Sequence, residues 1–350
     1  MRNLLKYYIK KRIYIVGILS IITIVLAFIF LGSRYIIEWE NNGILYLHPT
    51  NNPIEFYVII GSILATIIPM FEFSFKMKKI GIDHFYSFPI KREKLFFIKF
   101  IVGFLEVIIP FIIGTIFSYF SMIINGHIFK LQYYFIFILL SIPFLFSIYS
   151  MVSLIFSKCN TIADGIIMVG LLIFVFAPIM SLVNEIINSL TSYGEISPYS
   201  VSLLTIYTPY IYISDRIVLM MNGNIDATIE TIYIIIAILF LIFGIASVFI
   251  LVYTSKKEKS EDSMNLSSSW FSYKVFIPIL ITAFIGISSE ISLVVFLMLL
   301  GYIGYVIYRR SFKIKWYDWV SIGASVSTGL IINFFSDADD ILFLSSLIGY

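Results

Sequence analysis

The chain has 350 residues, of which 60% are hydrophobic and only 13% are charged, and its mean hydropathy is +0.98. Soluble domains are nearer half apolar and a quarter charged, so this composition excludes an ordinary soluble protein and predicts an all-α polytopic membrane protein. The net charge of +3 is too small to indicate a nucleic-acid partner, and the single cysteine, Cys159, excludes an internal disulfide and a cysteine-built metal site.

The first segment, residues 1–12, combines basic and apolar residues. Met1, Leu4, Leu5 and Tyr8 recur at helical spacing, which is typical of an amphipathic helix lying in the membrane interface. The alternative is a simple positive flank that orients the first span. No small-residue cleavage site follows, so we expect a retained first span rather than a signal peptide.

Nine apolar segments are candidate spans when compared with the ~20 residues that cross a hydrocarbon core. Six form a predicted core, over 13–31, 54–75, 95–124, 131–156, 161–183 and 231–253. Three more form a C-terminal extension of two or three spans, over 275–287, 291–308 and 319–335. We therefore expect an interface helix at 1–12, a six-helix domain at 13–255, and a cytoplasmic linker with the transmembrane extension at 256–350.

Basic residues predict the orientation of these spans. With the N-terminus inside, all but three of the 24 Lys and Arg residues fall in inner segments; the exceptions are Arg34, Lys130 and Arg216. Cytoplasmic loops carry such an excess of positive charge. The sequence therefore predicts a multi-pass protein of the cell membrane with a cytoplasmic N-terminus.

The predicted outer loop at 184–230 is long, yet it contains apolar runs and two prolines, Pro198 and Pro209. Loops of this length without structure are uncommon. We expect re-entrant helices here, between the fifth and sixth spans, that are shielded from lipid by protein. An ordinary extracellular cap is the alternative.

The inner segment 76–99 is the most basic part of the chain, and it surrounds an apolar, aromatic stretch at 80–90. We expect a short amphipathic helix there, which ends before Pro89 because the residue before a proline is disfavoured in the α region. A cytoplasmic loop with such a hydrophobic element indicates a docking site for another protein. An amphipathic loop that only rests on the membrane surface is the alternative.

One carboxylate lies deep within a predicted span. Glu106 is about 16 Å beyond Leu95 along its helix, and a charge at that depth is costly, which favours a functional role in a translocation path. The alternative is that Glu106 is protonated, or that it pairs within the bundle with a Ser, a Tyr or Lys99. Glu72 and Asp164 lie near the inner surface, where we expect structural roles.

Several catalytic motifs are missing from the sequence. It has no G-x-x-x-x-G-K-[ST] phosphate loop, no H-E-x-x-H and no G-x-S-x-G. The three histidines, His48, His84 and His127, are far apart in the chain. We therefore expect neither an ATPase nor a metalloenzyme in this chain.

Two stretches resemble a known family. Residues 83–95 read DHFYSFPIKREKL, which resembles the D-x-Y-x-S-L-P-[IV]-[KS]-R-x-x-L stretch of ABC transporter permeases of the type-2, exporter-like class. Residues 301–314 read GYIGYVIYRRSFKI, which is similar to the G-x-x-I-G-Y…R-S-F-K ending of a Gram-positive branch of acetoin-operon-type and antimicrobial-peptide exporter permeases. Phe88 stands where the family more often has Leu.

The resemblance implies that the segment 82–89 is a coupling helix which binds a separate ABC-type ATPase subunit; its residues are Ile82, Asp83, His84, Phe85, Tyr86, Ser87, Phe88 and Pro89. ATP and Mg²⁺ would then be bound by the ATPase, and no cofactor by this chain. A second permease subunit, identical or related, would complete the translocation path. The implied function is export of a hydrophobic or amphipathic substrate such as a peptide.

Three other functions stay open at this point. A secondary transporter would be expected to show internal repeats and several carboxylates at the midplane, and a lipid-modifying enzyme would need polar groups gathered at one interface. A non-transporting immunity or sensor subunit would use the same ATPase partner without carrying a substrate.

Overall fold

The computed structural model describes residues 2–30, 35–39, 45–49, 53–87, 90–124, 131–173, 207, 210–211, 213–214, 217–218, 231–256, 273–287, 290–309 and 311–336. The chain divides into two compact units. The first comprises Met1–Ser157 with Pro209–Ser260, and the second comprises Lys158–Thr208 with Glu261–Tyr350.

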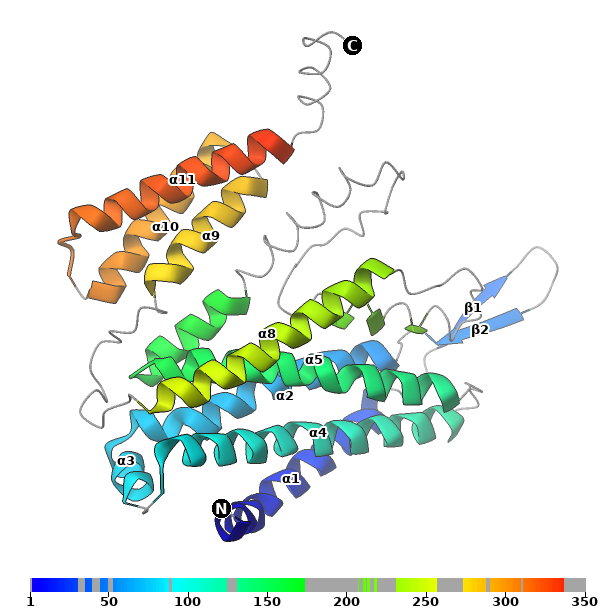
Figure 1. The fold of residues 1–350 in the computed structure, drawn as a ribbon. Helices are drawn as coiled ribbons and strands as arrows, with labels where there is room; N and C mark the ends of the chain where they lie inside the picture. Colours follow the sequence, from blue (N-terminus) through cyan, green and yellow to red (C-terminus); the bar gives the residue numbers. More distant parts are fainter. Residues whose placement is uncertain are drawn as a thin grey trace. The chain divides into compact units, whose positions relative to one another are not determined.

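The first unit is a bundle of long helices (Figure 1), formed by α1 (Arg2–Phe30), α2 (Pro53–Phe73), α4 (Arg92–Ile124), α5 (Leu131–Lys158) and α8 (Thr231–Ser255). Two short elements, the 3₁₀ turn η1 (Ser74–Met77) and the helix α3 (Lys79–Tyr86), connect α2 to α4. An antiparallel hairpin of β1 (Tyr35–Trp39) and β2 (Leu45–Pro49) lies between α1 and α2, with Tyr35 paired to Pro49. The second unit contains a helix over Ile162–Ile173 and α9 (Tyr273–Ile287), α10 (Ile291–Arg309) and α11 (Trp316–Ser336).

The predicted architecture of long apolar helices is confirmed among the described residues. Among the described residues, six helices are long and apolar enough to cross a membrane, over Leu5–Ile29, Ile54–Met77, Arg92–Ile124, Leu131–Lys158, Ala237–Ser255 and Ile291–Arg309. The helix at Ile162–Ile173 and α9 are shorter apolar helices. The β1–β2 hairpin was not predicted, because a loop sequence between two spans carries little periodic signal.

The predicted boundary between an interface helix and the first span is not present, because α1 is one continuous helix of 29 residues. Its first half contains neither proline nor glycine before Gly17, so nothing in the local sequence interrupts the helical hydrogen bonds at Arg12. A separate interface helix at 1–12 is therefore not confirmed. The predicted re-entrant helices at 184–230 fall almost wholly outside the described residues.

The two compact units have other boundaries than the predicted domains, which stay a prediction. The segment 158–208 is grouped with residues 261–350, whereas the prediction places it in a six-helix domain at 13–255. Within that second unit the Tyr273 hydroxyl lies 3.5 Å from Asp164 Oδ1, and this contact connects the Ile162–Ile173 helix to α9. Long-range grouping of this kind depends on side-chain packing, which hydropathy does not report.

Hydroxyl groups connect α1, α2 and α4 inside the first unit. Thr23 Oγ1 donates to the carbonyl oxygen of Pro110 over 3.0 Å, and Tyr57 Oη donates to the carbonyl oxygen of Thr23 over 3.0 Å. All three residues are buried. Small residues and interhelical hydrogen bonds are the usual means by which helices associate in membranes.

We predict that Gly103→Ala destabilises the first unit. A Cβ at this position of α4 would collide with the hydroxyl oxygen of Tyr149 and would lie 2.9 Å from Glu72 Cγ, and Tyr149 is fully buried. Overpacking of this kind typically costs about 1–3 kcal/mol. Thermal unfolding in detergent measures the effect, with Gly17→Ala as the control because no heavy atom lies within 4 Å of a Cβ there. Equal melting temperatures for the two variants would contradict this prediction.

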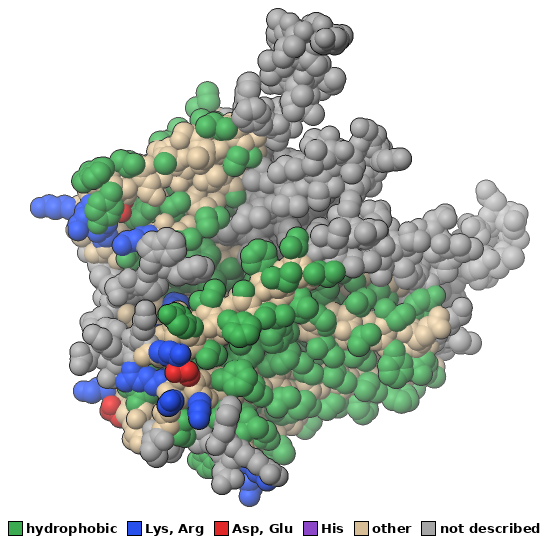
Figure 2. All heavy atoms as spheres, viewed as in Figure 1, with side chains coloured by type: hydrophobic (Ala, Val, Ile, Leu, Met, Phe, Trp, Pro, Cys, Tyr) green, Lys and Arg blue, Asp and Glu red, His purple; other side chains and the backbone are tan. Residues whose placement is uncertain are grey.

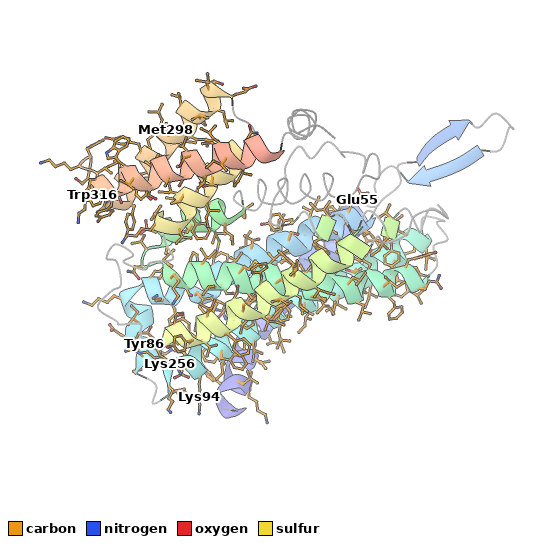
Figure 3. All side chains as sticks on the ribbon, turned by 45° about the horizontal axis from the view of Figure 1, so that its top comes forward. Glu55, Tyr86, Lys94, Lys256, Met298 and Trp316 are labelled. Carbon is orange, nitrogen blue, oxygen red and sulfur yellow. The ribbon has the colours of Figure 1, made fainter. Side chains whose placement is uncertain are left out.

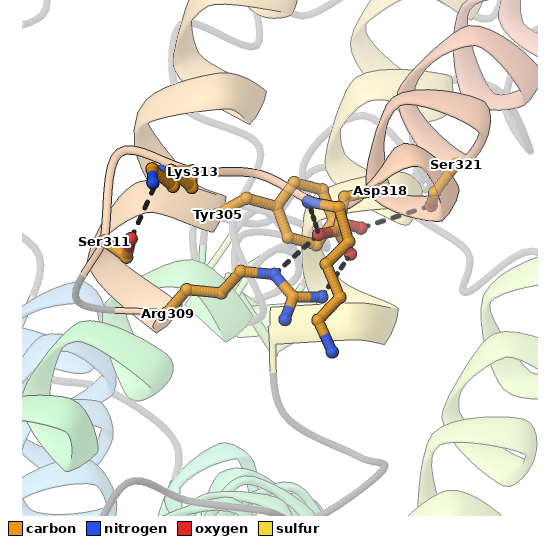
Figure 4. A network of polar contacts seen from close by, with 7 residues as sticks. Tyr305, Arg309, Ser311, Lys313, Asp318 and Ser321 are labelled. Carbon is orange, nitrogen blue, oxygen red and sulfur yellow. Dashed lines mark hydrogen bonds and ion pairs between the residues drawn. The ribbon is translucent and has the colours of Figure 1, made fainter.

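A polar network joins α10 to α11 in the second unit (Figure 4). Arg309 donates from Nε to Asp318 Oδ2 over 2.6 Å and from Nη2 to Asp318 Oδ1 over 2.9 Å. The backbone N–H of Lys315 donates to the same carboxylate over 3.3 Å. Bidentate pairs between arginine and carboxylate fix geometry as well as charge, so this pair holds the turn between the two helices.

Candidate functional site

The most unusual surface feature of the first unit is α3, a helix of eight residues beside η1. Gly81 is required at their contact, because a Cβ there would lie 2.5 Å from the carbonyl oxygen of Phe75. Ser87 Oγ donates to the carbonyl oxygen of His84 over 2.8 Å at the end of the helix. The predicted short helix at about 80–90 is therefore present, and its described residues are firmly placed against the bundle.

One face of α3 packs against its own bundle. Ile82 is buried, and the Phe85 ring lies 4.8 Å from the ring of Phe75 and 6.1 Å from the ring of Tyr8. The guanidinium of Arg92 lies over the Tyr86 ring at 4.6 Å. These apolar residues attach α3 to α1, η1 and α4.

The opposite face of α3 is exposed. Ile80 has 86% of its surface exposed, and Asp83, His84 and Ser87 are also exposed. These four positions follow the i, i+3, i+4, i+7 spacing that places residues on one side of a helix. The predicted docking residues are therefore divided between two faces, with Asp83, His84 and Ser87 outside and Ile82, Phe85 and Tyr86 toward the bundle. Phe88 and Pro89 lie outside the described residues.

Basic side chains surround this exposed face. Lys78, Lys79, Lys91 and Lys94 are exposed near the ends of α3 and α4, and Lys256 at the end of α8 lies 3.5 Å from Glu93. Figure 2 shows Lys and Arg side chains gathered at one end of this unit, and Figure 3 shows Lys94, Lys256 and Tyr86 there. Beyond this basic end, the surface along the length of the bundle in this view is mostly hydrophobic.

A buried cluster of charges lies next to the inner face of α3. Glu72 of α2 pairs through Oε1 with Arg12 Nη2 of α1, and its Oε2 lies 3.7 Å from Lys99 Nζ of α4. Arg12 Nε is also 3.6 Å from Glu106 Oε1. Glu72, Lys99 and Glu106 are at most 3% exposed. The two cations balance the two carboxylates, which is the condition under which buried charges are tolerated.

Glu106, predicted as a translocation-path residue, belongs to this cluster. Its pairing within the bundle follows the alternative interpretation, although the partner is Arg12 and the predicted partner Lys99 binds Glu72 instead. Glu72, which we expected near the inner membrane surface in a structural role, lies at the end of α2 and is 1% exposed. The sequence signal that could have found this cluster is the presence of a carboxylate in each of two consecutive predicted spans.

Among the described residues, no group of three or more His, Cys, Asp and Glu side chains is arranged to hold a metal ion. No protein-family model, curated protein or solved structure matches this chain. A function must therefore be inferred from two features of the first unit. One is the helix α3 at its basic end, with one buried and one exposed face, and the other is the adjacent cluster of two cations and two buried carboxylates.

Proposed function

We propose that this chain is the permease subunit of an ATP-driven ABC exporter in the cell membrane, with its N-terminus in the cytoplasm. The observation that carries the proposal is α3: its apolar face is used for attachment to the bundle, while Ile80, Asp83, His84 and Ser87 form an exposed face that is polar apart from Ile80. A helix that is fixed on one side and exposed on the other is suited to binding a soluble partner, here a separate ATPase subunit.

The basic surroundings of α3 support a cytoplasmic position, because positively charged loops remain inside the cell. ATP and Mg²⁺ would be bound by the ATPase, and a second permease subunit would complete the translocation path. Closure of the ATPase subunits on ATP would move α3, and with it α2 and α4. The weakly charged, aromatic-rich helices favour a hydrophobic or amphipathic cargo such as a peptide.

We predict that Ile80→Asp abolishes capture of the ATPase. Hot-spot side chains contribute about 2 kcal/mol or more to an interface, so we expect affinity to fall by about 30-fold or more. The tagged protein is solubilised in mild detergent from its native membrane, and the co-purifying proteins are identified and quantified by mass spectrometry. Because Ile80 is 86% exposed, the variant should fold like the wild type.

The matched control is Phe312→Asp. Phe312 is 83% exposed and lies in the turn between α10 and α11. The control therefore replaces a similarly exposed apolar residue that is not part of α3. Recovery of an ABC-type ATPase with the wild type and Phe312→Asp, but not with Ile80→Asp, would support the proposal. An intact wild-type preparation without any ATPase would contradict it.

A secondary transporter is the second candidate, and the buried cluster of Arg12, Glu72, Lys99 and Glu106 is the observation that favours it. Carboxylates buried within a membrane bundle are typical of ion and proton pathways. Purified protein in liposomes, without an ATPase, separates the two functions: transport driven by a proton or sodium gradient alone would favour the secondary transporter.

A further inference from the structure

We propose that Lys99 is a positioning residue that links the docking helix α3 to the buried charge cluster, so that displacement of α3 changes the ion pairing of α1, α2 and α4. The role in transport rests on the proposed function, whereas the link itself is a property of this chain alone.

The first half of the link is an aromatic cage around the Lys99 ammonium. Nζ lies 4.0 Å from the ring centroid of Phe85 on α3 and 4.0 Å from that of Phe75 on η1. The ring of Tyr8 on α1 lies 5.8 Å away. A cation is attracted to the faces of aromatic rings, and more strongly where water is excluded. Lys99 is only 2% exposed, so this attraction is not screened by solvent.

The second half of the link is the α2 terminus. Lys99 Nζ donates to the carbonyl oxygen of Glu72 over 3.2 Å and lies 3.7 Å from Glu72 Oε2. The other carboxylate oxygen of Glu72 pairs with Arg12, which in turn contacts Glu106. One ammonium group of α4 therefore contacts α3 and η1 on one side and Glu72 of α2 on the other, and Glu72 is in turn paired with Arg12 of α1.

This arrangement makes the two halves interdependent. If α3 moves outward, the Phe85 ring leaves the ammonium, while Phe75, Tyr8 and Glu72 remain beside it. A buried cation that loses part of its environment becomes more costly, so the Lys99 side chain and the Glu72 carboxylate must rearrange. Arg12, shared by Glu72 and Glu106, is the next group affected.

Hydrogen–deuterium exchange of the purified full-length chain in detergent tests the link without any partner. In Lys99→Met we expect exchange in residues 79–87 and 5–12 to accelerate by about tenfold, since α3 and the start of α1 lose a shared cation. Lys94→Met is the matched control, because Lys94 is an exposed residue of the same helix. Unchanged exchange in residues 79–87 of Lys99→Met would overturn the proposal.

A second variant, Phe85→Leu, tests the same link in case Lys99→Met does not fold. This substitution keeps the four charged side chains of the cluster and an apolar side chain at position 85, but it removes the aromatic ring that faces the Lys99 ammonium. We therefore expect faster exchange in both α3 and residues 5–12. An effect of Phe85→Leu confined to α3 would show that no link to α1 exists, and would overturn the proposal.

The role in transport is tested with the captured ATPase. We expect Lys99→Met to retain ATPase binding within about threefold of wild type, while transport falls by about tenfold or more. Loss of binding as large as in Ile80→Asp would overturn this separation of docking from coupling. Absence of an ATPase from the wild-type preparation would contradict the proposed function alone, since the exchange experiment is independent of it.

Discussion

Replacing Arg12 with methionine is expected to lower the free energy of unfolding by about 3 kcal/mol, near the lower end of the range for removing one partner from a buried ion pair, because the Arg12 side chain is 26% exposed. Arg12 is shared by Glu72 and Glu106, and both carboxylates are almost wholly buried. Without the guanidinium, Lys99 would be the remaining cation of the cluster. Thermal unfolding in detergent, followed by size-exclusion chromatography, measures the change.

Lys11→Met is the control for this prediction, because Lys11 is the exposed neighbour of Arg12 and its replacement removes the same charge from the N-terminal segment. The double variant Arg12→Met with Glu106→Gln should recover part of the loss, since it removes one of the orphaned carboxylates. Equal stabilities of Arg12→Met and Lys11→Met would show that the cluster contributes nothing to folding.

Arg309→Met is expected to destabilise the second unit by about 3 kcal/mol, near the lower end of the range for buried pairs because the Arg309 side chain is 15% exposed. The Asp318 carboxylate would keep the N–H of Lys315 as a partner but would lose both guanidinium bonds. The turn between α10 and α11 should open as a result. Limited proteolysis by trypsin after Lys313 and Lys315 measures this opening.

Lys313→Ala is the matched control for the turn, because Lys313 is exposed and its side chain takes no part in the Arg309–Asp318 pair. Cleavage after Lys315 should remain slow in this variant and accelerate in Arg309→Met. Resistance of Arg309→Met to trypsin at this position would mean that other contacts of α10 and α11 suffice to hold the turn.

Most of the helices could be predicted from the sequence, because membrane spans are defined by length and hydropathy. The third predicted span begins at residue 95 and α4 begins at Arg92, and the fourth is predicted at 131–156 and observed at Leu131–Lys158. The continuity of α1 follows from a local sequence without proline or glycine before Gly17. The assignment of 158–208 to the second unit could not be predicted, because it depends on contacts between residues that are distant in the chain.

The faces of α3 illustrate the same limit on a smaller scale. The helix and its basic surroundings follow from local composition. An apolar face predicts that the helix packs against something, but it does not show whether the partner is the bundle of this chain or another protein. In the structure Phe85 packs against Phe75 and Tyr8, and Ile80 is the exposed apolar residue of the outer face. The pairing of Arg12, Glu72, Lys99 and Glu106 likewise has no periodic signature, because its members lie on three different helices.

The order of the clustered charges along the chain has a consequence for biogenesis. A lone charge at the centre of a membrane helix costs about 2.5–3.5 kcal/mol on insertion, and Glu106 carries that cost until it meets a cation. Arg12, which pairs with both Glu72 and Glu106, is synthesised before either carboxylate. Each carboxylate therefore leaves the ribosome after a cation that can neutralise it, and α1 can act as a docking template for α2 and α4 while they enter the bilayer.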